Sequence, residues 1–150
     1  MRLSDNFSLR EFLRSGTAAR HGIDMTPPPE VVENLQRLCR DVLQPLREYL
    51  GTAVMVTSGY RPPELNRLIG GSAKSQHMLG EAADIIAVGY RPIEVAESIR
   101  LLQLPYHQLI HEFGDWTHVS VAPFGQPARG QVLTATRRDG RILYLAGLHA

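Results

Sequence analysis

The chain has 150 residues, a formal net charge of +1 and a single cysteine. A chain of this length forms one domain and buries roughly 70% of its unfolded surface, so it needs no disulfide bonds. The small charge and the scattered basic residues give no indication of nucleic-acid binding, and no run approaches the roughly 20 apolar residues of a membrane-spanning helix. We therefore expect one domain over residues 1–150, a monomer with no membrane insertion.

The N-terminus and the cysteine bear on where the chain is made. Residues 1–16 lack a continuous apolar core and a small-residue cleavage site, so we expect synthesis in the cytoplasm without a signal peptide. Cys39 lies among leucines and valines, which predicts a small core residue. A buried thiol is compatible with a reducing compartment.

Helices are predicted in the first third of the chain. The spacing from Ser8 to Glu11 is that of a capping box, which opens a short helix ending near residues 15–16. A second short helix is expected over residues 17–21.

The longest predicted helix begins after Thr26, at three consecutive prolines, and ends at Gly51. We expect Pro45 to kink it, because proline removes a backbone donor from the helix interior. Apolar residues recur every three or four positions and predict one buried face: Val31, Leu35, Leu38, Val42, Leu46 and Leu50.

The rest of the chain is predicted to consist mainly of strands. Apolar and β-branched runs predict strands at 53–57, 83–88, 107–113 and 116–121, then a hairpin, 132–136 and 141–145, that turns at Asp139-Gly140. Short helices are expected at 62–69 and 92–102. Helices first and strands later favour an α+β domain in which N-terminal helices pack on a mostly antiparallel sheet.

Two histidines and one aspartate lie in or near apolar strands, where a polar side chain needs a cation or a hydrogen-bond partner. Asp84 begins an apolar strand, where a buried carboxylate is costly without a cation or several hydrogen-bond donors. His118 also lies in an apolar strand, and Gly80 permits a turn that would bring His77 towards Asp84. Two imidazoles and one carboxylate are the kind of ligand set that a catalytic Zn²⁺ uses when it keeps its fourth position for water, so His77, Asp84 and His118 are candidate metal ligands, with surface or core residues as the alternative reading.

The other four histidines are weaker candidates. We interpret His21, His107 and His149 as surface or core residues. His111 stands seven residues before His118, so strand alternation places the two on opposite faces unless the chain turns between them. His111 is therefore expected at most to support a ligand.

Three ordered motifs carry a family resemblance. Residues 75–84 read SQHMLGEAAD, residues 115–118 read DWTH, and residues 57–61 read TSGYR. Over residues 3–121 the chain resembles the D-Ala-D-Ala carboxypeptidase-like zinc peptidases. That family includes vancomycin-resistance dipeptidases and phage endolysins and shares its fold with the hedgehog signalling domain. The resemblance implies this fold, Zn²⁺ on the three ligands named above, and peptidoglycan stem peptides as substrate.

The resemblance also implies a catalytic carboxylate three residues before the last histidine ligand, which is Asp115. Glu112 is the alternative base, because strand alternation lets it face the same side as His118. The carboxylate would take a proton from water and return it to the leaving amine.

The same resemblance implies roles in substrate binding or catalysis for three further residues. Arg61 is expected to stabilise the substrate carbonyl or the tetrahedral intermediate. Ser75 would bind substrate or orient the ligand loop, and Trp116 would form a wall.

The implied function is zinc-dependent hydrolysis of peptidoglycan peptide bonds, as by an endolysin that acts on the cell wall after release through a separate pore. The alternatives are a D-Ala-D-Ala carboxypeptidase or dipeptidase and a non-catalytic, zinc-stabilised module that binds the cell wall.

Overall fold

A six-stranded sheet lies at the centre of the computed structural model, which describes residues 1–150. The strand order is β3-β4-β6-β5-β7-β8, and every neighbouring pair is antiparallel except β5 and β7. The strands are β3 (Val54–Ser58), β4 (Ala82–Ala87), β5 (Gln108–Glu112), β6 (Trp116–Ser120), β7 (Gln131–Arg138) and β8 (Arg141–Ala146). The predicted α+β class with a mostly antiparallel sheet is confirmed.

The N-terminal segment begins with a small two-stranded sheet that was not predicted. Its strands are β1 (Arg2–Ser4) and β2 (Phe7–Ser8), and the helices that follow are α1 (Leu9–Leu13) and α2 (Gly16–His21). The predicted capping box is present, because the carboxylate of Glu11 accepts a hydrogen bond of 2.7 Å from the backbone N–H of Ser8.

The long helix is not continuous. It consists of α3 (Pro29–Leu38), a π-helical turn η1 (Cys39–Leu43) and α4 (Gln44–Leu50). The N–H of Gln44 donates to the carbonyl of Cys39, five residues earlier. The wider turn stands directly before Pro45, which has no N–H and whose ring would meet the carbonyl of Asp41 in a regular helix. The interruption expected at Pro45 thus takes the form of a π-helical turn. None of the helices is both long and apolar enough to cross a bilayer.

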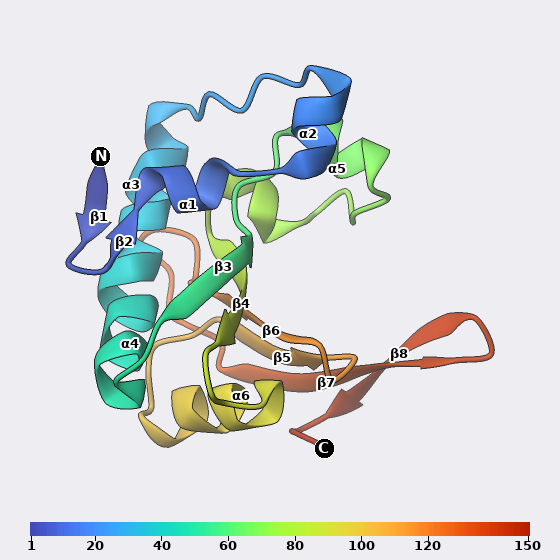
Figure 1. Cartoon of the computed structure of the whole chain (residues 1–150). Helices are drawn as coiled ribbons and strands as arrows, with labels where there is room; N and C mark the ends of the chain where they lie inside the picture. The colour runs from blue at the N-terminus through green and yellow to red at the C-terminus, as the bar shows by residue number, and fades with distance from the viewer.

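One face of the sheet packs into the main core. Helix α6 (Pro92–Leu101) lies against this face, while α5 (Pro63–Leu68) and the 3-10 turn η2 (Gln76–Leu79) lie on the other side (Figure 1). Apolar side chains from the sheet, from α6 and from the long helix form the core: among them Ala83, Ile85, Leu109, Val119, Val95, Ile99, Leu35 and Val42. Side chains alternate between the two faces of a strand. Asp84 and His118, each adjacent in sequence to one of these core residues, therefore face away from the core.

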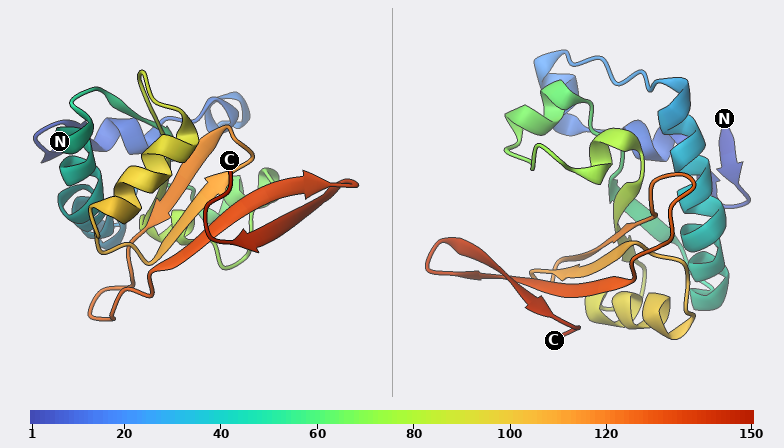
Figure 2. Two further views of the ribbon diagram at one scale, coloured as in Figure 1. Left: turned by 90° about the horizontal axis from the view of Figure 1, so that it is seen from below. Right: turned by 180° about the vertical axis from the view of Figure 1, so that it is seen from behind.

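The C-terminal hairpin of β7 and β8 extends beyond the body of the molecule (Figures 1 and 2). Arg138 pairs with Arg141, so two residues form the turn. Both have positive φ, 52° at Asp139 and 75° at Gly140, as this type of hairpin turn requires. The predicted hairpin is confirmed.

Gly59, directly after β3, lies so close to α1 that no side chain fits. A Cβ there would stand 2.6 Å from the Cα and the carbonyl oxygen of Phe12. The backbone N–H of Tyr60 donates to the same carbonyl at 2.8 Å, which holds the two segments together.

We expect Gly59→Ala to lower the free energy of unfolding by about 1–3 kcal/mol, because the added methyl group forces backbone apart. Urea denaturation measures the change. Gly16→Ala is the matched control, since its nearest neighbour is the flexible end of Arg20 at 3.3 Å; this helical position should be neutral or more stable. Equal stability of both variants and the parent would contradict the packing assigned to Gly59.

Candidate metal centre

The three predicted ligands lie together. Donor atoms of His77, Asp84 and His118 are all within 4.8 Å of one another, and all three residues are buried. Asp84 on β4 pairs in register with His118 on β6, and His77 comes from η2. Oδ1 of Asp84 is 3.3 Å from Nε2 of His77 and 2.9 Å from Nδ1 of His118. The arrangement brings two imidazoles and one carboxylate to one point.

His77 is held in the form that a metal ligand needs. Its Nδ1–H donates to the carbonyl of Gly59 at 2.8 Å, so the lone pair is on Nε2. Nε2 is buried and has no hydrogen-bond partner. Burial also lowers the pKa of His77, which keeps the ring neutral. An unpartnered buried lone pair beside a carboxylate fits a bound cation.

Asp84 stays ionised although it is buried. Burial by itself raises the pKa of this carboxyl, but the two neighbouring imidazoles, above all the hydrogen bond from His118, outweigh burial and hold the pKa below its usual range. Nδ1 of His118 donates to Oδ1 at 2.9 Å. The site therefore carries a negative charge where a cation would be stabilised.

The loop that carries His77 is fixed at both ends of η2. The hydroxyl of Ser75 accepts a hydrogen bond of 3.2 Å from the backbone N–H of His77. Gly80 has φ 71°, and a Cβ there would be 2.6 Å from the carbonyl oxygen of Val31 on α3. Of the two roles expected for Ser75, this contact corresponds to orienting the ligand loop.

The two candidate bases lie in different surroundings. Oε1 of Glu112 is 4.0 Å from Nδ1 of His118. Burial raises the pKa of Glu112, and the charge of Asp84 adds to this effect, while His118, Trp116 and Arg61 oppose it. Asp115 is exposed in the turn between β5 and β6, and its side chain makes no ion pair or hydrogen bond with a ligand. The structure thus brings Glu112, and not Asp115, to the ligands.

Arg61 supplies a cation beside these carboxylates. Its backbone N–H donates to the carbonyl of His77 at 3.0 Å, and its Nε is buried without a hydrogen-bond partner. Burial lowers the pKa of Arg61, while Asp84 and Glu112 raise it. A half-buried guanidinium with an unused donor can bind an oxygen that gains negative charge.

Trp116 forms one side of the site. It pairs with Glu112 across β5 and β6, and its ring meets that of Phe113 edge-on at 5.6 Å between centroids. Its indole Nε1 is buried without a hydrogen-bond partner. The indole thus lies beside Glu112, and its role as a wall for substrate stays a prediction.

His111 is not at the site. It pairs with Thr117, so its side chain is on the opposite face of the sheet from His118. Its Nδ1–H donates to the carbonyl of His149 at 2.8 Å. His111 therefore fastens the C-terminal segment and supports no ligand.

Sequence reasoning missed the part played by Gly59. The glycine packs against α1, and its carbonyl orients His77 from a position 18 residues away. The TSGYR motif was the only signal, and it did not specify this contact.

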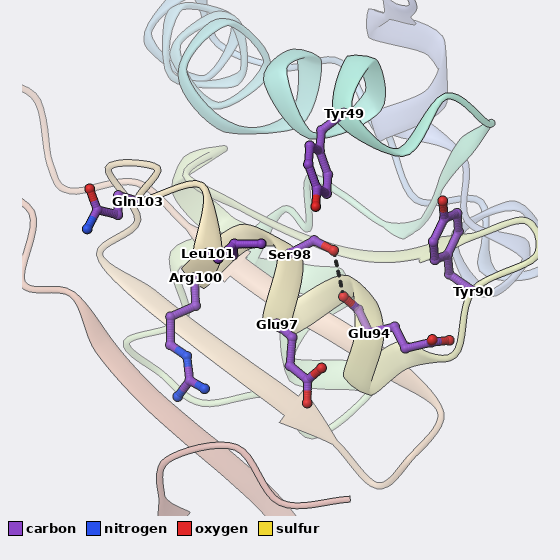
Figure 3. Close-up of a pocket in the computed structure, with 8 residues that line it drawn as sticks. All are labelled: Tyr49, Tyr90, Glu94, Glu97, Ser98, Arg100, Leu101 and Gln103. Carbon is purple, nitrogen blue, oxygen red and sulfur yellow. Dashed lines mark hydrogen bonds between the residues drawn. The ribbon is translucent and has the colours of Figure 1, made fainter.

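A separate surface hollow lies between α4 and α6 (Figure 3). Tyr49 and Tyr90 border it together with the exposed side of α6. Because α6 packs on the core face of the sheet, the hollow is on the other side from the ligands. It contains no histidine or cysteine and contributes nothing to the metal centre.

Comparison with protein families agrees with this geometry. The model of one family, Peptidase M15, matches residues 5–120. The matched segment contains the three ligands, Arg61 and Glu112, and it ends at the last residue of β6. A comparison with curated proteins found no match. Members of the family are metal-dependent peptidases, and the match covers more than half of the chain. The chain therefore belongs to the M15 family of metallopeptidases.

Proposed function

We propose that the protein is a Zn²⁺-dependent peptidase that hydrolyses amide bonds in peptidoglycan stem peptides or their cross-links, as a phage endolysin does. The observation that carries the proposal is the buried cluster of His77, Asp84 and His118, with an unpartnered Nε2 and a carboxylate beside it. Within this proposal the protein is made in the cytoplasm and reaches the cell wall through a separate pore.

The donor set suits zinc. Two imidazole nitrogens and one carboxylate oxygen are the ligands that catalytic Zn²⁺ uses when the fourth position stays open. When bound, Zn²⁺ supplies a Lewis acid that lowers the pKa of water from 15.7 to about 7. A purely structural zinc site fills all four positions with protein ligands, so three ligands beside a free carboxylate favour an enzyme over a wall-binding module.

Glu112 is the proposed general base, in place of Asp115. It takes a proton from the attacking water and later returns the proton to the leaving amine. Burial raises its pKa, which moves it closer to the pH at which a base exchanges protons efficiently. Asp115 points into solvent, so its sequence position three residues before His118 does not bring it to the reaction.

Arg61 and Trp116 complete the proposed site. The guanidinium of Arg61 donates to the carbonyl oxygen of the substrate as negative charge develops there. Its burial strengthens the interaction, because the surrounding dielectric is low. Trp116 packs beside the substrate, and Ser75 keeps the His77 loop in place.

Murein sacculi test the function directly. We expect the purified protein to release new amino termini, to stop when a chelator is added, and to recover with Zn²⁺. Mass spectrometry of the fragments then separates an endopeptidase from a carboxypeptidase, which would release free D-alanine. If the protein contains stoichiometric zinc and binds the sacculi but does not cleave them, it is instead a wall-binding module.

A ligand variant tests the metal centre. We expect His77→Ala to lose both stoichiometric zinc and activity, because three donors become two. Metal content is measured by mass spectrometry after dialysis. His21→Ala is the control, since His21 is exposed and bonds only within α2. Full zinc occupancy in His77→Ala would remove His77 from the ligand set.

A matched pair of amide variants identifies the base. We expect Glu112→Gln to retain zinc and lose about 10²–10⁴-fold in kcat, because the amide cannot accept the proton. Asp115→Asn makes the same change at the exposed position and should stay within about twofold of the parent, since it removes no base. The opposite pattern would restore Asp115 as the base.

A further inference from the structure

The outer part of the sheet carries a tyrosine on the same face as the metal ligands. Glu112 pairs with Trp116 on one side and with Ala135 on the other, and Ala135 pairs with Tyr144. Directly opposed residues on neighbouring strands point to the same face. Trp116, Glu112, Ala135 and Tyr144 therefore form one row across the sheet, which lies beside the row that contains His118.

Tyr144 lies within reach of Glu112. Neighbouring strands are about 4.8 Å apart, so two spacings, or about 10 Å, separate the backbones of these residues. The residue between them is an alanine, which leaves room above the sheet, yet Ala135 is fully buried. Its larger neighbours on that face therefore cover it. Partial burial raises the pKa of the Tyr144 phenol, and the negative charge of Glu112 adds to this effect.

The hydroxyl of Tyr144 has no role inside the protein. It makes no hydrogen bond, and the residue is 58% exposed. Ile142, two residues earlier on the same face of β8, is also half exposed. All of β8 is exposed on both faces, so the side that carries Tyr144 is distinguished by its position in the same row as Glu112.

The hairpin that carries Tyr144 lies beyond the segment that matches the family model. The family match ends at residue 120, before β7 begins at Gln131. The hairpin nevertheless joins the site, because β7 pairs along the whole of β5, the strand that ends at Glu112. The hairpin thus borders the site although it lies beyond the matched segment.

We propose that Tyr144 is a substrate-binding residue, whose ring forms the outer wall of the substrate path and whose hydroxyl donates to a carbonyl or carboxylate oxygen of the bound peptide. A phenol is protonated at neutral pH, so its O–H can donate to the substrate. This inference rests on the proposed function, since it places the peptide between the metal ligands and the hairpin.

Kinetics of Tyr144→Phe test the hydrogen bond. We expect KM for a synthetic stem pentapeptide to rise about three- to tenfold, with kcat within about twofold, because the contact is made before and during the reaction. Tyr144→Ala should raise KM further, since the wall is lost as well. Leu143→Ala is the control: Leu143 is the adjacent residue of β8 and faces the other way. An unchanged KM in Tyr144→Phe, or an equal rise in Leu143→Ala, would overturn the proposal.

A binding measurement separates this proposal from the proposed function. Trp116 is the only tryptophan of the chain and stands in the same row as Tyr144, so its fluorescence should report peptide binding. In zinc-loaded Glu112→Gln, adding Tyr144→Phe should raise the Kd for the pentapeptide about three- to tenfold. If the parent hydrolyses nothing but this shift is found, the proposed function fails and the role of Tyr144 stands. If the parent is active and neither KM nor Kd shifts, only the role of Tyr144 fails. Absence of both hydrolysis and binding overturns both.

Discussion

The pairing of β4 with β6 is the constraint on which the site depends. It sets Asp84 directly opposite His118 and turns both away from the core, while their neighbours Ala83 and Val119 fill it. A shift of this register by one residue would move the carboxylate to the core face and an apolar side chain to the site. The same hydrophobic alternation that stabilises the sheet therefore also positions two of the three ligands, and only His77 must be supplied from elsewhere.

His77 is supplied by a chain of close backbone contacts. Gly59 packs against α1 and orients the imidazole through its carbonyl, while Gly80 packs against α3 and ends η2. Each glycine stands where a Cβ would overlap backbone atoms of a helix. The N-terminal helices thus help to position His77 through these two backbone contacts. The packing of Gly59 on α1 and of Gly80 on α3 fixes the position of the His77 loop relative to the sheet.

Much of this could be predicted from the sequence. The helical periodicity, the hairpin turn and the α+β class follow from local patterns, and the three ligands follow from ordered motifs. The two candidate bases differ, because counting residues back from His118 favours Asp115 whereas the geometry favours Glu112. Phe113 and Gly114 both have positive φ, 58° and 70°, and this turn directs Asp115 into solvent while Glu112 remains on the strand. Backbone conformation at a turn is not specified by spacing alone.

The parallel pairing of β5 with β7, which brings Tyr144 to the site, joins segments distant in sequence and leaves no local signal.

The division of the ligands between a loop and the sheet has a thermodynamic consequence. An ion held by His77, Asp84 and His118 would bridge η2 to β4 and β6, and the unfolded chain cannot offer that cage. Occupancy and folding are then coupled equilibria, so the melting temperature should rise with the concentration of free ion. Without the ion, hydrogen bonds between strands still hold two of the candidate ligands, and the contacts of Gly59, Ser75 and Gly80 still hold the third. Binding of the ion would thus add stability to a site that the protein has already arranged.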